Sequence, residues 1–192
     1  MPGRPRDGGL ESRLLAAAWQ LLTSEGYASL TLARVAADAG AHRSDVYRRW
    51  ATKAQLVARV LEDYLPAIPA CDTGELRSDI ELYVRALAES WSQPWIDGLL
   101  GLLADLREDV DAELRFRRLG ERRGEPVREA VRRAVERGEL MAEPDLGLLG
   151  DMLEGPLMHR RMVGRQPLTA EYLDSVVEVA HRMVCFDEVL RP

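Results

Sequence analysis

Residues 42–49 gather polar and basic side chains on a short segment with helical spacing. Val46 and Trp50 are four residues apart, so both face inward if the segment is a helix. The other side chains then point outward: His42, Arg43, Ser44, Tyr47, Arg48 and Arg49. The guanidinium of Arg43 has the forked geometry to bind guanine O6 and N7, and the remaining donors suit phosphate oxygens. The segment therefore has the chemistry of a helix built to enter the major groove of DNA.

A second short helix must precede this one to hold it in place. Apolar side chains recur there at the spacing of one helical face: Leu32, Val35, Ala36 and Ala39. Thr31 can cap the first turn by accepting from a backbone amide. Gly40 can end the helix, because only glycine adopts a left-handed backbone conformation cheaply. Two short helices joined by a glycine turn predict a helix-turn-helix.

Several motifs in fixed order extend this pattern. They are Ala17-Ala-Trp-Gln-Leu-Leu, Glu25-Gly-Tyr-Ala-Ser-Leu-Thr, Val35-Ala-Ala-Asp-Ala-Gly, Val46-Tyr-Arg-Arg-Trp and Thr52-Lys-Ala-Gln-Leu-Val. Through them residues 10–65 resemble the DNA-binding domain of the TetR family of bacterial transcriptional regulators. The rest of the chain resembles a TetR-type ligand-binding domain more loosely, best over residues 154–168 (Glu154-Gly-Pro-Leu-Met-His-Arg-Arg-Met-Val-Gly-Arg-Gln-Pro-Leu168).

The resemblance implies an all-α chain of about nine helices. An N-terminal three-helix helix-turn-helix DNA-binding domain, residues 10–65, is followed by a helical ligand-binding and dimerisation domain, residues 66–192. Residues 1–9 form a flexible basic arm. Its Arg4 and Arg6 either lie along phosphates or in the minor groove, or have no role in binding.

The resemblance also implies which side chains face DNA: Arg43, Ser44, Asp45, Tyr47 and Arg49. Tyr47 and Arg49 are better placed for phosphate, as is Lys53, and Thr31 joins the same DNA-binding set. A packed core position is the alternative for Tyr47, and simple solvation is favoured for Arg48.

Asp45 departs from the family pattern, in which small or hydroxyl residues are more usual at this position. Phosphates repel a carboxylate. Asp45 could instead accept from a cytosine amino group, or cap the helix, or pair locally with Arg43 or Arg49. The sequence leaves these alternatives open.

Every periodic segment has the helical period, and no strand or hairpin pattern occurs. Residues 10–22 and 52–65 predict the first and fourth helices, ending near Gly26 and Pro66. A fifth helix has its apolar stripe at Leu76, Ile80, Tyr83, Val84, Leu87 and Trp91. Residues 95–106 predict a short, well-buried helix, residues 109–137 either one kinked helix or two, and residues 145–163 and 169–189 the last two helices.

Charge is distributed unevenly along the 192 residues, whose net charge is −6. The first 60 residues carry about +4 and the remainder about −10. A basic head on an acidic body is expected when one end meets phosphate.

Composition argues against other classes of protein. No apolar run is long enough to span a bilayer, and the basic start lacks the apolar stretch of a signal peptide. Cys71 and Cys185 suit free thiols in a reducing cytoplasm. The three histidines, His42, His159 and His181, have no metal-ligand spacing, and no catalytic motif or cofactor site is evident. We expect a cytoplasmic protein that is not an enzyme and needs no cofactor or metal.

Two further predictions concern the C-terminal body. Aromatic, methionine and histidine side chains could line an effector pocket, although such stripes are more often plain core: Tyr64, Tyr83, Trp91, Trp95, Phe116, Met152, Met158, His159 and Met162. His159 could receive an anionic effector, but a partly exposed dimer-face position is favoured for it. Apolar faces on the last two helices, too broad for one core, predict a homodimer interface: Leu149, Leu153, Leu157, Tyr172, Val176, Val177, Ala180, Met183 and Val184.

Together these observations predict a homodimeric repressor that a small molecule of unknown identity releases from a palindromic operator in double-stranded DNA. The alternatives are an architectural DNA binder without an effector, or an all-α enzyme.

Overall fold

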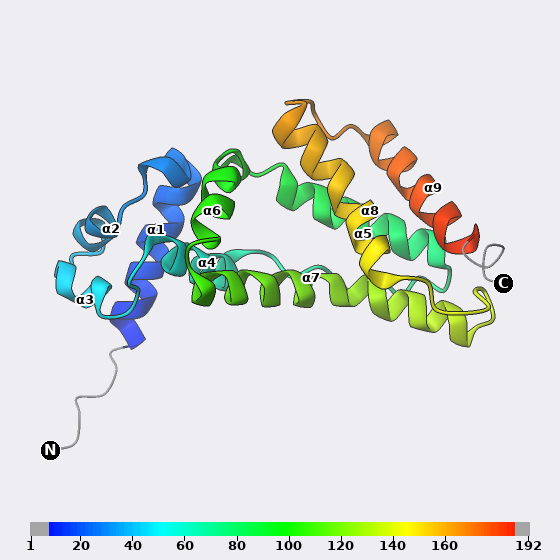
Figure 1. Cartoon of the computed structure of the whole chain (residues 1–192), viewed down its shortest axis with the longest axis horizontal. Helices are drawn as coiled ribbons and strands as arrows, with labels where there is room; N and C mark the ends of the chain where they lie inside the picture. The colour runs from blue at the N-terminus through cyan, green and yellow to red at the C-terminus, as the bar shows by residue number, and fades with distance from the viewer. Residues whose placement is uncertain (1–7, 187–192) are drawn as a thin grey trace, which may run out of the picture. The chain divides into compact units, whose positions relative to one another are not determined.

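The computed structural model describes residues 8–186, and all regular structure in this range is helical (Figure 1). Nine α-helices, a 3₁₀ turn (η1) and a π-helical turn (η2) make up the described chain. The predicted all-α fold class is therefore confirmed. The helices divide between two compact units, with one boundary between Leu65 and Pro66.

The first unit contains the described residues up to Leu65 together with Pro94–Leu119. Its elements are α1 (Gly8–Ser29), α2 (Leu32–Asp38), α3 (Arg43–Tyr47), α4 (Lys53–Tyr64), η1 (Pro94–Gly98), α6 (Leu99–Leu106) and the beginning of α7 (Val110–Glu136). The backbone of α1 leaves helical geometry at Gly26 (φ 81°), where the sequence predicts its end. The core lies where α1 packs against α4, η1 and α6.

The second unit contains Pro66–Gln93 and the described residues from Gly120 onward. It is built from α5 (Leu76–Trp91), the rest of α7, α8 (Leu146–Met158), η2 (His159–Val163) and α9 (Ala170–Phe186). All six side chains of the predicted α5 stripe are buried. They are covered because α5 packs against both α8 and α9, and α8 also packs against α9.

Two predicted segments differ in detail, and the sequence leaves a third, residues 109–137, open between one helix and two. Residues 94–106 form η1 followed by α6 rather than one buried helix, and Leu100 is 60% exposed. Residues 110–136 form the single helix α7, which runs through Pro126. Four side chains of α7 after the proline are buried: Val127, Ala130, Val131 and Ala134. Their packing offsets the backbone hydrogen bond that Pro126 cannot donate. The prediction for residues 145–163 divides into α8 and the π-helical η2.

Several features bear on the classes of protein considered. Within residues 8–186, no helix combines the length and apolar character needed to cross a membrane. In the same range no group of histidine, cysteine and acidic side chains is arranged to hold a metal ion. Within the described residues, Cys71 (buried) and Cys185 (half-buried) form no disulfide. The last few residues predicted for the final helix lie outside the described range.

Two glycines allow η1 and α6 to approach Tyr27, which is only 3% exposed. A Cβ added at Gly98 would lie 2.6 Å from Tyr27 Cβ and 2.9 Å from its backbone nitrogen. One added at Gly101 would lie 3.1 Å from Tyr27 Cδ1. Because backbone and Cβ atoms cannot swing aside as a side-chain tip can, Gly98 is required by this contact.

We therefore expect Gly98→Ala to lower the free energy of unfolding by about 1–3 kcal/mol, the usual cost of overpacking. Urea denaturation at neutral pH measures the change. The matched control is Gly120→Ala in α7, where an added Cβ has no heavy atom within 4 Å. That variant should gain up to about 1 kcal/mol from helix propensity. Equal effects of the two substitutions would contradict the close-packing argument.

Candidate nucleic-acid interface

The helix-turn-helix begins at Thr31, which caps α2 as predicted. Its backbone is extended (φ −134°, ψ 150°), and its Oγ1 accepts from the backbone N–H of Arg34 at 3.2 Å. Gly40 takes the left-handed conformation (φ 61°) after α2, and Ala41 N–H donates to Ala36 O at 2.8 Å. The chain therefore reverses tightly between α2 and α3, and the two helices pack against each other.

The core anchors α3 through the two inward residues predicted from spacing. Val46 is fully buried and Trp50 is 7% exposed. Thr52 then caps α4, because its Oγ1 accepts from Gln55 N–H at 3.1 Å. Because α3 spans only Arg43–Tyr47, these anchors rather than its own hydrogen bonds fix its orientation.

The outer side of α3 presents donors to solvent. Arg43 and Ser44 are exposed, and within residues 8–186 the Arg43 guanidinium has no hydrogen bond or ion pair. Tyr47 is 53% exposed, which excludes the alternative of a packed core tyrosine. A cationic fork and two hydroxyl groups are therefore available on one short helix for base edges and phosphates.

Of the alternatives for Asp45, the ion pair with Arg43 or Arg49 is wrong, and the cytosine contact stays a prediction. Its carboxylate pairs with Arg48, at 2.7 Å from Nη2 to Oδ1, and not with Arg43 or Arg49. Arg49 instead donates from Nη1 to the backbone oxygen of Asp45 at 2.9 Å. Arg48, which the sequence favours as merely solvated, thus neutralises the one carboxylate of the helix. The negative charge of Asp45 is compensated before any DNA is bound.

Other residues of the predicted DNA-binding set lie in different situations. Lys53 Nζ donates to Tyr27 O at 3.2 Å and lies 3.9 Å from the centre of the Tyr27 ring. Its ammonium is already engaged inside the first unit, so a phosphate contact by Lys53 stays a prediction. Thr31 is solvent-exposed, although its hydroxyl oxygen caps α2. Arg4 and Arg6 fall outside the described residues.

Polar contacts distant in sequence fasten the helix-turn-helix to the rest of its unit. Tyr27 OH donates to Asp105 Oδ2 at 2.6 Å, and burial followed by this carboxylate raises the pKa of Tyr27. Thr52 Oγ1 donates to Asp109 Oδ2, while Gln55 Nε2 donates to Asp109 Oδ1 at 3.1 Å. The start of α4 is therefore joined directly to the start of α7, where Asp109 Oδ1 also accepts from Ala112 N–H.

The conformation of the α1–α2 connection is fixed by one bidentate ion pair. Arg34 donates from both Nη atoms to the two carboxylate oxygens of Glu25, each at 2.7 Å. This hydrogen bonding holds the pKa of Glu25 below its ordinary value. Both side chains are solvent-exposed, so this ion pair adds little to the stability of the fold, and its main role is to orient the α1–α2 connection.

Comparison with known proteins identifies the family to which this helix-turn-helix protein belongs. The family model for bacterial regulatory proteins of the tetR family matches residues 14–60, and that for the tetracyclin repressor-like C-terminal domain matches residues 70–180. The second alone covers more than half of the chain. The chain belongs to the TetR family. It is therefore a DNA-binding transcriptional regulator, as its relatives also are.

Curated relatives of this TetR-family chain match over most of their length. An uncharacterized HTH-type regulator, YdeS of Bacillus subtilis, is 27% identical over 95% of this chain and 93% of its own. The DNA-binding transcriptional repressor TetR of Mycobacteroides abscessus is 31% identical over 86% and 88%. The crystal structure of the TetR family regulator SCO0332 superposes with a TM-score of 0.71, at 29% identity, over 92% of this chain and 98% of the other.

The residues predicted for an effector pocket are distributed over both units, and their role stays a prediction. Tyr83 and Trp91 are buried in the second unit on α5, whereas Trp95 and Phe116 belong to the first unit. The others lie in α8 and η2: Met152 and Met162 are half-buried, and Met158 and His159 are exposed. Tyr64 stacks on Trp19, with ring centres 5.4 Å apart.

The residues predicted for a dimer interface are mostly used within the subunit. Seven of the nine are buried in the second unit: Leu149, Leu153, Leu157, Val176, Val177, Ala180 and Val184. Only Tyr172 and Met183 keep appreciable surface, and both are half-buried. The apolar side chains that α8 and α9 do expose are different ones, notably Leu148 (50%) and Val179 (53%).

Sequence reasoning missed Arg123, a charged residue half-buried in the second unit. Its Nη1 donates to Pro66 O and its Nη2 to Ser90 Oγ at 2.7 Å. Burial lowers the pKa of Arg123, and the carboxylate of Glu154 acts against this. Burial also raises the pKa of Tyr83, to which Glu154 contributes as well. Arg123 lies in an arginine- and glutamate-rich run that otherwise suggests a solvated face, and no local signal distinguishes it.

The contact between Thr52 and Asp109 generates a stability prediction. Thr52→Val removes both the cap of α4 and the hydrogen bond to Asp109, so we expect a loss of about 1–2 kcal/mol in unfolding free energy. The control is Thr23→Val, because Thr23 Oγ1 donates only to backbone oxygens of its own helix, those of Trp19 and Gln20. This change should stay within about 0.5 kcal/mol.

The effect of Thr52→Val should also depend on pH. Burial of the Asp109 carboxyl opposes ionisation, but hydrogen bonds from Thr52, Ala112 N–H and Gln55 outweigh it and lower the pKa of Asp109. A lowered pKa stabilises the fold above the unfolded value near pH 4, and this contribution is lost as pH falls below it. The difference between variant and parent should therefore shrink at about pH 3. A difference independent of pH would show that Asp109 contributes nothing.

Proposed function

We propose that this TetR-family regulator is a homodimeric repressor that reads a palindromic operator with α3. One observation carries the proposal: α3 exposes Arg43, Ser44 and Tyr47 on its outer side while Val46 and Trp50 anchor it from within. Arg43 would bind a guanine edge, and Tyr47 and Arg49 would hold phosphates.

Repression, rather than activation, is supported by the Mycobacteroides abscessus relative, whose name states that it is a repressor. Release by a small molecule is the second part of the proposal. A ligand can shift the protein from its DNA-binding state only if it binds the two states with different affinity, typically by about 1–3 kcal/mol. An architectural DNA binder would instead show no sequence preference and no response to ligands.

The decisive experiment selects fragments from genomic DNA with the purified protein at about 0.15 M salt, near physiological ionic strength. We expect enrichment of a short palindrome by the parent protein, and its loss in Tyr47→Ala. Arg117→Ala is the control, because Arg117 is exposed on α7 without a described partner. It should enrich the same sequence.

Two outcomes would contradict the assignment. Enrichment that survives Tyr47→Ala would mean that α3 is not the reading helix. Binding of all fragments alike by the parent protein would support the architectural alternative, because backbone contacts alone carry no sequence information.

A dimer follows from the same proposal, since two recognition helices about 34–36 Å apart read half-sites one helical turn apart. The interface we propose is the outward side of α8 and α9, centred on Leu148 and Val179. The seven predicted residues that are buried within the subunit have little surface left to lose on association. Because Leu148 and Val179 are both about half exposed, each has area to lose on association.

Val179→Glu should therefore weaken self-association by roughly a hundredfold or more, since it places an unpaired charge in an apolar contact. Sedimentation velocity over a range of protein concentrations measures the shift from dimer to monomer. Leu100→Glu is the matched control, an exposed apolar residue (60%) on α6. If both variants stay dimeric, the interface lies elsewhere; if both dissociate, the effect is not local.

A further inference from the structure

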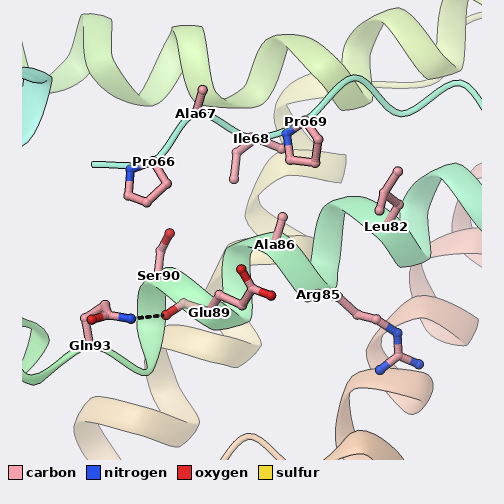
Figure 2. A pocket seen from close by; sticks show the side chains of 10 residues that line it. All are labelled: Pro66, Ala67, Ile68, Pro69, Leu82, Arg85, Ala86, Glu89, Ser90 and Gln93. Atoms are coloured by element: carbon pink, nitrogen blue, oxygen red, sulfur yellow. Dashed lines mark hydrogen bonds between the residues drawn. The ribbon is translucent and has the colours of Figure 1, made fainter. Parts of the chain in front are cut away.

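A cavity of about 390 Å³ lies between residues 66–69 and α5 in the second unit. Figure 2 shows the segment from Pro66 to Pro69 passing over one side of α5, with the cavity between them. Six of its lining residues are apolar: Pro66, Ala67, Ile68, Pro69, Leu82 and Ala86. The volume falls within the range of small-molecule sites, roughly 300–1,000 Å³. None of the residues predicted for an effector pocket lines it.

Two polar side chains of the lining offer acceptor oxygens, Glu89 and Gln93. Within residues 8–186 the Glu89 carboxylate has no hydrogen bond or ion pair. Gln93 uses its Nε2 to donate to Glu89 O at 3.2 Å, which leaves its Oε1 to accept. Figure 2 shows the carboxylate of Glu89 and the amide of Gln93 on the same side of the cavity. Ser90 Oγ accepts from Arg123 and keeps its own hydroxyl proton to donate.

The charges around the cavity favour a positive occupant. Arg85 also lines it, but Glu81 and Asp174 bind its Nη2 at 2.7 and 2.8 Å. Glu81 also pairs with Arg77 at 3.7 Å, and Asp174 offsets the charge of Arg85 as well. The Arg85 guanidinium points away from residues 66–69 in Figure 2. Arg123 donates to Ser90, and the carboxylate of Glu154 opposes its positive charge. Of the two charged side chains that line the cavity, Arg85 is therefore paired, while Glu89 has no described partner.

We propose that this cavity binds a small organic cation, with an apolar body against residues 66–69 and α5 and its ammonium group on Glu89. The inference deepens the proposed function, because it gives an effector a site and a chemical class. The proposed ligand would also contact Pro66, whose carbonyl oxygen accepts a hydrogen bond from Arg123. Binding itself requires no DNA, so its test is separate from that of operator recognition.

The test is calorimetric titration of the full-length protein, without DNA, using three probes that share a phenethyl body. Phenethylammonium is the cation, phenethyl alcohol the neutral analogue and hydrocinnamate the anion. We expect affinity in that order, with only the ammonium probe bound more weakly as salt is raised. Equal or tighter binding of the alcohol or the carboxylate would overturn the proposed charge preference, and so would no binding of the ammonium probe at millimolar concentration.

Two variants locate the site. Glu89→Gln keeps the shape of the side chain and removes its charge, so it should weaken phenethylammonium binding roughly five- to tenfold, towards the affinity of the alcohol. Glu136→Gln, at the exposed end of α7 and outside the cavity, should leave binding unchanged. Ala86→Phe fills the cavity and should abolish binding of every probe, with folding checked by circular dichroism. Binding that survives both cavity variants would place the probe elsewhere and overturn the proposal.

If the binding results hold, adding phenethylammonium to the protein–operator complex tests regulation. Loss of the complex in the parent protein but not in Glu89→Gln would support the cavity as an effector site. A complex that persists although the probe is bound would show that the site does not control DNA binding, while operator recognition itself would stand.

Discussion

The contact of Tyr27 with η1 and α6 is the constraint on which the DNA-binding unit depends. Its ring packs against Gly98 and Gly101, and its hydroxyl donates to Asp105. The ammonium of Lys53 donates to the carbonyl oxygen of Tyr27 and lies over the face of its ring. One residue near the end of α1 therefore connects α6 and α4, the helix that follows α3. Since α3 is too short to be stable alone, its position is set by this surrounding frame.

Polar groups at helix ends make the same frame specific. Backbone amides at the start of a helix have no partner inside it, so side chains must satisfy them. Thr31 does this for α2, and Thr52 for α4. At the start of α7, the carboxylate of Asp109 accepts from the backbone amide of Ala112, and it also accepts a hydrogen bond from the hydroxyl of Thr52. Two helix starts, 57 residues apart in sequence, are thereby linked through a hydroxyl and a carboxylate.

What could be predicted from the sequence is what neighbouring residues determine. The caps at Thr31 and Thr52, the left-handed turn at Gly40 and the buried stripe of α5 each follow from a few adjacent positions. The partners of Tyr27 and Arg123 are far away in sequence, so spacing cannot identify them. A broad apolar face also looks the same whether the subunit's own core or a second subunit covers it. That ambiguity explains why residues such as Leu153 and Ala180, predicted for an interface, are buried within the subunit.

The pairing inside α3 changes how its basic character should be understood. Three arginines occur between residues 43 and 49, yet only Arg43 has no described hydrogen bond or ion pair. Arg48 is neutralised by Asp45, whereas Arg49 donates one hydrogen bond to a backbone carbonyl and keeps its charge. Salt dependence of DNA binding reflects the number of phosphates neutralised, at a slope of roughly −0.9 for each. A count of arginines therefore overstates the non-specific attraction of this helix. On the proposed function, sequence discrimination would rest instead on directional hydrogen bonds from Arg43 and Ser44, on a helix that the buried Val46 and Trp50 hold in place.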